Sequence, residues 1–546
     1  MIMRKFKYII LTTIFSFMVF SCEQESMQLN PYPSSGSGGS SGSSGSASFA
    51  KFVTIGGSYT SGLMDGALHD FGQSHSVAKM ISNQLALAGG SSSFNQPDIN
   101  SANGYIGPGP DGVPGTADDQ GRTYLTQSAS TGAIGLSFTQ GDIASVLTPY
   151  SGDKSALNNF GFPNSVLGMF LTPAAGGPNV AANPAYNDFF ARFDASGATI
   201  SPIGQFIGSG ASFYMAWLGF SDFLAYAARG GDQAQVPIPD AATLGTYFSQ
   251  ALGACQTMNP VWKGVVGNVP DILAAPYFQF IAATVAKPTE IIPLANDATL
   301  ASLQGLATGY NLTVNGLALA GAITAQEAAM RQFSWSAGAN AVLVNDEALT
   351  DLGPYWDGMV LAGQLDAVSR AGLEPYRTAR QAKDGEILPL AAQAVIGLPV
   401  NPAAPTAVWG VSVPLSDQYF LTGSELVEFE TARATYNAAV ASAVSAYGGG
   451  RVALADFNGY FAGLAGASPF SNNGVAVTYD FAPPTGMWST DGIHPNARGY
   501  ALVANKFINA INEAFGASVP EASVGSYTGA ALPVTCLLYT SDAADE

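Results

Sequence analysis

Short apolar runs alternate along the chain with segments whose apolar residues recur at helical spacing. Residues 52–55 (Phe-Val-Thr-Ile) form a β-branched run that ends at Gly56, which predicts a buried strand. Over residues 77–88 the apolar positions follow a helical period and stop before a pair of glycines, which predicts a helix. Residues 263–270 and 452–455 predict further strands. This alternation predicts an α/β fold in which helices cover both faces of a parallel sheet.

Two sequence signals mark where later helices begin. Thr422 and Glu425 form a capping box, and the helix that follows is expected to stop at Gly448. Asn496 is expected to cap a last helix with an apolar face that extends to Phe515. We expect partly helical insertions where the chain is rich in Ala, Gly and Pro and weakly periodic, at about 91–150, 172–210 and 275–420.

The N-terminal residues resemble an export signal. Residues 1–21 combine a basic head with an apolar stretch too short to span a bilayer with ease. The segment Val-Phe-Ser-Cys that ends at Cys22 resembles the lipobox of bacterial lipoproteins, where the cysteine is lipidated after cleavage, although Phe20 is bulkier than the usual residue. An ordinary secretory signal with an incidental cysteine is the alternative. Residues 22–48, rich in Gly and Ser towards their end, predict a flexible tether.

A lipid on Cys22 would make the membrane a partner of this protein. Acyl chains hold a protein at a bilayer through buried methylene groups and need no transmembrane helix. We therefore expect an anchored protein in the bacterial outer membrane or at the cell surface, with a periplasm-facing position as the alternative.

The C-terminal residues 536–546 match the in-frame translation of a transposase adapter used in sequencing libraries. We interpret them as an artefact, with a genuine polar tail as the alternative. Of the three cysteines, Cys22 then belongs to the lipidation site and Cys536 to this tail, so that Cys255 is left alone. A single cysteine forms neither an internal disulfide nor a Cys-type zinc site, and we expect Cys255 to be a core residue.

Composition narrows the classes of function. Hydrophobic residues make up 47% of the 546 residues and charged residues only 11%, which excludes an intrinsically disordered chain. The net charge of −19, without a cluster of Lys and Arg, argues against nucleic acid as a partner. We predict no cofactor and no metal site. The oxygen-rich loop over 107–119 does not have EF-hand spacing, and a solvated loop is favoured over a calcium loop.

Two short segments carry candidate chemistry. Asp491 lies three residues before His494, so its carboxylate can fold back, accept the Nδ1–H and leave Nε2 free to act as a base. Ser58 follows the first predicted strand in a Gly-rich turn, at the end of the strand where ligands gather in open α/β sheets. Taken singly, the Asp491–His494 segment is as typical of a surface loop as of a site, and the Ser58 segment is more typical of an ordinary Gly-rich turn.

Together the segments resemble the conserved blocks of the SGNH, or GDSL, hydrolase family. Residues 56–59 (Gly-Gly-Ser-Tyr) correspond to its Gly-Asp-Ser-Leu block, and residues 491–495 (Asp-Gly-Ile-His-Pro) to its Asp-x-x-His-Pro block. Residues 219–222 (Gly-Phe-Ser-Asp) line up with Gly-x-Asn-Asp, and residues 159–164 with the loop that carries an oxyanion glycine. The four blocks follow the family's order. The resemblance implies a three-layer αβα fold with a flavodoxin-like parallel sheet.

The resemblance also implies roles for individual residues. Ser58 would be the nucleophile, His494 the base and Asp491 the carboxylate that orients it. The oxyanion hole would combine the backbone N–H groups of Ser58 and Asn164 with the side chain of Ser221.

Three positions depart from the family pattern: Gly57 replaces Asp, Asn164 replaces Gly and Ser221 replaces Asn. The replacement of Asn by Ser221 should affect activity most, because a side-chain amide donor in an oxyanion hole is worth roughly 10²–10³ in rate. A serine hydroxyl can also donate, but it is shorter and rotates freely. Reduced or redirected activity is therefore expected.

The expected function is that of a membrane-anchored serine ester hydrolase, of the esterase, lipase or acetyl-esterase type, acting on an acylated glycan, a lipid or a small ester. The alternative is a non-catalytic or weakly active surface lipoprotein that uses the same fold to bind glycan or lipid. Because Ser58 and His494 would belong to one active site, residues 49–531 are expected to form one hydrolase domain enlarged by insertions.

Overall fold

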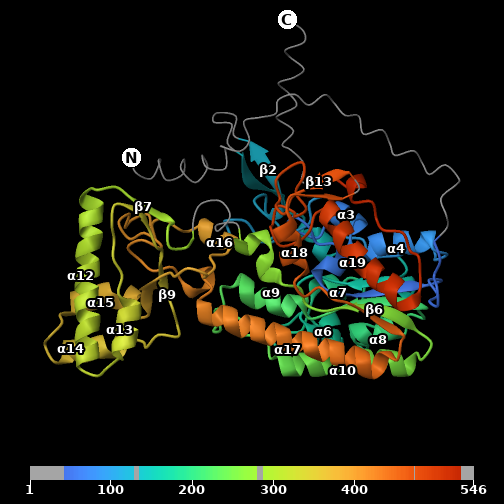
Figure 1. The fold of residues 1–546 in the computed structure, drawn as a ribbon, viewed down its shortest axis with the longest axis horizontal. Helices are drawn as coiled ribbons and strands as arrows, with labels where there is room; N and C mark the ends of the chain where they lie inside the picture. Colours follow the sequence, from blue (N-terminus) through green and yellow to red (C-terminus); the bar gives the residue numbers. More distant parts are fainter. Residues whose placement is uncertain (1–41, 128–133, 280–286, 473, 530–546) are drawn as a thin grey trace, which may run out of the picture. The chain divides into compact units, whose positions relative to one another are not determined.

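The computed structural model describes residues 42–127, 134–279, 287–472 and 474–529 (Figure 1). The predicted signal peptide, Cys22, most of the predicted tether and the tail over 536–546 lie outside these residues. The described chain forms two compact units. The sheet unit contains the residues up to Leu224, Pro239–Pro276 and the residues from Ala432 onward; the second unit contains Ala225–Ile238 and Tyr277–Thr431.

A five-stranded parallel sheet forms the centre of the sheet unit. Its spatial order is β11-β6-β5-β1-β4, and every neighbouring pair is parallel. Counted along the chain, this order is 2-1-3-4-5, the doubly wound order of flavodoxin-like sheets. The strands are β1 (Phe52–Gly56), β4 (Asn159–Gly161), β5 (Phe213–Trp217), β6 (Lys263–Gly267) and β11 (Val452–Ala455).

Side chains of β5 alternate between two helical layers. Trp217 packs against α19 (Ala497–Phe515), whereas Tyr214 on the opposite face accepts a hydrogen bond from α10 (Ala241–Met258). Cys255 of α10 is 2% exposed, so the expected core cysteine is confirmed. The α19 layer also holds α4 (Val77–Leu87), and the α10 layer holds α6 (Leu167–Phe170), α8 (Pro202–Ile207) and part of α17 (Gly423–Gly448). The predicted α/β fold with helices flanking a parallel sheet is therefore confirmed.

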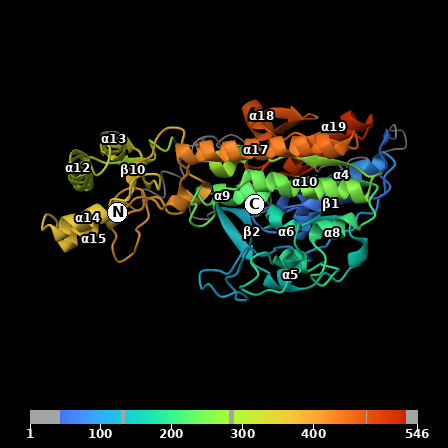
Figure 2. The same ribbon diagram turned by 90° about the horizontal axis from the view of Figure 1, so that it is seen from below.

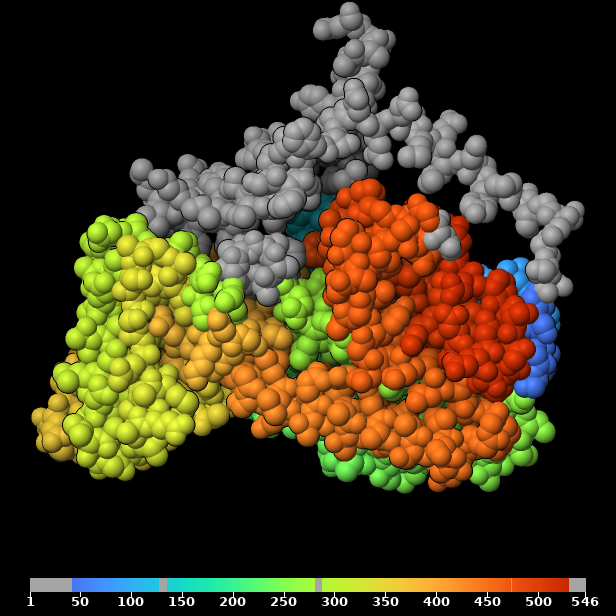
Figure 3. Space-filling view, in the orientation of Figure 1, coloured from blue at the N-terminus to red at the C-terminus, as the bar shows by residue number. Residues whose placement is uncertain are grey.

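Helix α17 lies next to α10 in both ribbon views (Figures 1 and 2). The chain from α17 to α19, orange to red, forms much of the visible surface of the sheet unit in Figure 3. Both helices begin where the sequence predicts. The Thr422 N–H donates to Glu425 Oε2 over 2.7 Å, as a capping box requires. Asn496 Oδ1 accepts the N–H of Gly499 and so caps α19.

The remaining elements of the sheet unit are short. They include a hairpin of β2 (Gln120–Gln127) and β3 (Ile134–Gln140) within the insertion predicted over about 91–150. The others are α2 (Ser58–Ser61), α3 (Asp70–Ser74), α5 (Ile143–Leu147), α7 (Asp188–Ala191), α9 (Phe220–Ala228, whose last residues fall in the second unit), α18 (Tyr460–Ala467), β12 (Phe470–Asn472) and β13 (Val475–Val477).

The last residues of the predicted tether contact the sheet unit. The Gly42 N–H donates to Leu87 O over 3.0 Å, and the Ser46 N–H donates to Phe515 O over 2.9 Å. Ala47 is buried. Residues 42–48 are therefore held by backbone hydrogen bonds, and this part of the chain differs from the predicted flexible coil.

Most of the insertion predicted over about 275–420 builds the second unit, which has a hydrophobic core of its own. Tyr310, Leu343 and Trp356 are each at most 1% exposed in that core. The unit contains α12 (Ala298–Leu319), α13 (Ala325–Arg331), α14 (Gly353–Leu361), α15 (Ala367–Leu373), α16 (Leu390–Gln393) and the antiparallel pairs β7 (Ile292–Leu294) with β8 (Gly338–Asn340) and β9 (Leu343–Asn345) with β10 (Ala379–Gln381). Among the described helices of both units, none is long and apolar enough to cross a membrane.

Candidate active site

Ser58 lies directly beyond the carboxyl end of β1. The neighbours of β1 on both sides, β4 and β5, come later in the chain, so β1 lies at the switch point of the sheet, where ligands bind in doubly wound folds. A Cβ at Gly56 would come within 2.6 Å of Trp217 O, so only glycine allows this close approach. The chain therefore turns sharply and places Ser58 at the first position of α2, 5% exposed.

Ser58, His494 and Asp491 form one hydrogen-bonded chain. His494 Nε2 lies 3.0 Å from Ser58 Oγ, and His494 Nδ1 lies 2.8 Å from Asp491 Oδ2. An ionised carboxylate can only accept, so Nδ1 carries the ring proton and Nε2 accepts the hydroxyl proton of Ser58. The structure thus brings together the three residues that the sequence nominates as nucleophile, base and orienting carboxylate.

Asp491 is fixed by its own turn. Its Oδ1 accepts the N–H groups of Ile493 and His494, each over 2.8 Å, and its Oδ2 accepts the N–H of Gly66 over 2.8 Å. Burial raises the pKa of Asp491, but the His494 ring and these turn N–H groups outweigh burial and hold the pKa below its usual value. The carboxylate therefore stays ionised beside the imidazole.

Tyr59 holds the His494 loop through a hydrogen bond and a ring contact. Its hydroxyl donates to Ile493 O over 2.6 Å, and its ring lies edge-on to the His494 ring with centroids 5.4 Å apart. Burial raises the pKa of Tyr59 well above its ordinary value, so the hydroxyl remains a donor. The sequence pattern does not single out Tyr59, because its role depends on contacts with residues more than 400 positions away.

Asp65 also holds this loop, through hydrogen bonds from Thr490. Its Oδ1 accepts the N–H and the hydroxyl of Thr490, over 3.0 and 2.8 Å. Its backbone is left-handed, with φ of 57°. An Asp-Gly pair is a turn signal, so the sequence could have predicted the turn at Asp65 but not its partner.

The position of the expected oxyanion glycine is filled by Asn164, and it adopts the conformation that glycine would favour. Asn164 has φ of 54°, a region that asparagine tolerates better than most residues. The Asn187 side chain donates to the carbonyls of Pro163 and Asn164, over 3.0 and 3.1 Å, and holds this turn in place. Replacement of glycine by asparagine therefore leaves the backbone in the left-handed region.

Ser221 lies beside the nucleophile turn. It belongs to α9, which follows β5, so Ser58, Asn164 and Ser221 follow three adjacent strands. A Cβ at Gly57 would come within 2.9 Å of Ser221 Oγ. Gly57 and Ser221, two of the positions that depart from the family pattern, therefore lie in contact with each other.

Asp222 connects the loops that follow β4 and β5. Its Oδ2 accepts the N–H of Leu167 over 2.9 Å. Burial raises the pKa of Asp222 to about 7, although the Leu167 N–H opposes this. The resemblance identifies Asp222 only as the last position of the Gly-x-Asn-Asp block. The structure shows in addition that its side chain binds the backbone of Leu167.

The other two histidines do not join this chain of hydrogen bonds. His69 is 1% exposed and caps α3, and burial lowers its pKa to about 4, so the ring is neutral. The Nδ1 of His75 lies 2.8 Å from Phe71 O. Within the described ranges, the His, Cys, Asp and Glu side chains around Ser58 do not form a metal-binding group of three.

Comparison with known proteins gave no matching family model, no significant match among curated proteins and none among solved structures. The likeness to SGNH hydrolases therefore depends on the four sequence blocks and on the geometry of the residues in them.

Proposed function

We propose that this protein is a serine ester hydrolase of the SGNH type. The observation that supports this most strongly is the hydrogen-bonded chain from Ser58 through His494 to Asp491 at the carboxyl end of β1. In serine hydrolases of several unrelated folds, the same arrangement of hydroxyl, imidazole and carboxylate performs acyl transfer.

The proposed reaction has two halves. His494 Nε2 takes the proton of Ser58 as Oγ attacks the ester carbonyl carbon, and Asp491 stabilises the imidazolium. The oxyanion would be held by the N–H groups of Ser58 and Asn164 and by the hydroxyl of Ser221. The imidazolium then gives its proton to the departing alcohol oxygen, which leaves an acyl group on Ser58. A water deprotonated by His494 attacks this acyl-enzyme and releases the acid.

The proposed substrates are acylated glycans, lipids and small esters, and the proposed location is the bacterial outer membrane or cell surface, through a lipid on Cys22. The lipobox-like segment ending at Cys22 supports the anchor. Labelling of cells with an alkyne-tagged fatty acid tests it: wild type should be labelled and Cys22→Ser should not.

Labelling with a fluorophosphonate probe tests the chemistry, because the probe reacts with activated serines. We expect wild type to be labelled and Ser58→Ala to lose the label and at least 10³-fold of ester turnover, since triad members account for most of the rate in enzymes of this type. Ser74→Ala, an exposed serine of α3, is the matched control and should behave as wild type. If wild type is labelled no better than Ser58→Ala, the esterase proposal fails and a surface lipoprotein that binds glycan or lipid becomes the better description.

A further inference from the structure

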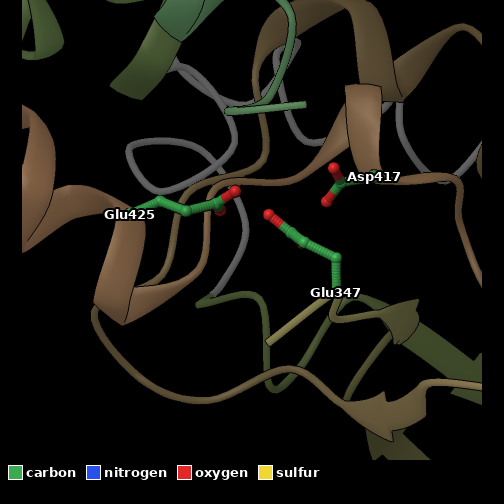
Figure 4. Close-up of side chains that lie close together, drawn as sticks. All are labelled: Glu347, Asp417 and Glu425. Carbon is green, nitrogen blue, oxygen red and sulfur yellow. The ribbon is translucent and has the colours of Figure 1, made fainter. Parts of the chain in front are cut away.

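Three carboxylates of the second unit converge on one point. Glu347 follows β9, Asp417 lies just before α17, and Glu425 lies in the first turn of α17. One oxygen from each lies within 4.8 Å of the others, and Figure 4 shows the three side chains directed toward one another. Glu347 is exposed and Glu425 is 4% exposed, so the cluster is closed on one side and open to solvent on the other.

The capping box of α17 sets the direction of Glu425. Its Oε2 accepts the N–H of Thr422 over 2.7 Å. The other oxygen, Oε1, is buried and has no hydrogen-bond partner among the described residues, and the same holds for Oδ1 of Asp417. Two of the three residues therefore each present a buried oxygen with no donor to satisfy it.

A buried tyrosine, Tyr226, belongs to the turn beside Glu425. Tyr226 is 0% exposed, and its hydroxyl has no hydrogen-bond partner within the described part of the chain. The N–H of Gly231 donates to Tyr226 O over 3.2 Å, so Tyr226 and Gly231 belong to one turn. The turn that contains Gly231 lies so close to Glu425 that a Cβ at Gly231 would collide with Glu425 Oε1.

No described basic side chain is bonded to these carboxylates. The buried guanidinium of Arg380 is held by Asp346 and Glu386, over 2.5 and 2.6 Å, and so is already neutralised. Buried like charges are costly unless a cation or a shared proton compensates them.

We propose that Glu347, Asp417 and Glu425 bind a calcium ion. Ligands that are all oxygen favour a hard cation. Calcium–oxygen distances of about 2.3–2.6 Å allow two ligand oxygens to lie up to about 5 Å apart, whereas about 2.0–2.1 Å for magnesium allows only about 4 Å. Three oxygens within 4.8 Å of one another are within the reach of calcium. Magnesium demands near-ideal octahedral geometry and gives up its water reluctantly, so we expect it to bind this set more weakly.

Calorimetric titration of the purified full chain with calcium chloride, after treatment with EDTA and dialysis, tests the site. We expect one calcium ion per chain and a midpoint of thermal unfolding that rises with calcium, since a ligand that binds the folded state stabilises it. Glu347→Gln should raise the Kd at least tenfold; the side chain is exposed and keeps its volume, so the fold should persist. Magnesium chloride should bind at least tenfold more weakly than calcium.

Two control variants separate this site from other acidic groups. Glu290→Gln changes an exposed glutamate of the same unit and should leave the Kd unchanged. Asp118→Asn changes the oxygen-rich loop over 107–119 and should also leave it unchanged. The proposal is overturned if wild type gives no calcium heat and no thermal shift, if Glu347→Gln binds as wild type does, if Asp118→Asn abolishes binding, or if magnesium binds as tightly as calcium.

Discussion

At Ser221 a hydroxyl replaces the amide of the family pattern, and its Oγ lies beside the position where Gly57 has no Cβ. An asparagine at 221 would extend into that space and bring a fixed N–H donor to the nucleophile turn. Because one such donor is worth roughly 10²–10³ in rate, and a serine hydroxyl supplies only part of it, Ser221→Asn should raise kcat for a short-chain ester about tenfold with little change in KM. Unchanged or lower turnover would show that Ser221 is not a weakened oxyanion donor.

The raised pKa of Asp222 predicts that the stability of the protein depends on pH. Its pKa is about 7 in the folded protein and 3.8 when unperturbed, so the folded state binds this proton more tightly than the unfolded state. The free energy of unfolding should therefore fall as pH rises from about 4 to 7, by at most about 4 kcal/mol from this group, at about 1.4 kcal/mol per pH unit. Urea unfolding at pH 5 and pH 8 measures the effect. Asp222→Asn should lose less stability over this range than wild type does, and an equal loss in both proteins would contradict the assignment.

At the scale of elements, Asn496 links α19 to the His494 loop. Its Oδ1 caps the helix, and its Nδ2 donates to the carbonyls of Gly486 and Trp488, over 2.8 and 3.0 Å. Asn496→Ala removes the cap and leaves two buried carbonyls without this donor, so the free energy of unfolding should fall by about 3 kcal/mol. Because His494 lies two residues earlier, kcat should also fall at least tenfold.

Asn509→Ala is the matched control for this prediction, since Asn509 lies on the exposed side of α19 and bonds only to Glu521 among the described residues. It should change the stability by less than about 0.5 kcal/mol and leave kcat unaltered. Urea unfolding and ester hydrolysis by the two variants measure both effects. Equal kcat values in Asn496→Ala and wild type would mean that the cap does not position the base.

The elements that the sequence predicts well are those with local signals. The capping box at Thr422, the cap at Asn496 and the β-branched run of β1 each depend on residues within a few positions, and the structure confirms all three elements. Strand β4 has only three residues and carries no such signal. The contacts of Tyr59 and Asp65 with the His494 loop join residues more than 400 positions apart, so no local pattern could reveal them.

On the scale of the whole molecule, the candidate site and the second unit have separate cores. Ser58, Asp491 and His494 all belong to the sheet unit, while Leu343 belongs to the core of the second unit. Leu343→Ala should lower the stability of the second unit by about 2–5 kcal/mol through the cavity that it creates. Since a compact unit with its own core can unfold by itself, kcat at 25 °C and the temperature at which activity is lost should stay close to wild type.

The comparison variant is Leu85→Ala, because Leu85 is 1% exposed in α4 of the sheet unit and loses the same atoms. Leu85→Ala should lower the stability of the sheet unit by about the same 2–5 kcal/mol. Activity should then be lost at a lower temperature than in wild type, because the weakened core supports the candidate active site. Calorimetry and residual ester hydrolysis, recorded over the same temperature ramp, separate the two cases. If Leu343→Ala shifts the temperature of activity loss as far as Leu85→Ala does, then the two units unfold as one cooperative structure, and the second unit contributes to the stability of the candidate active site.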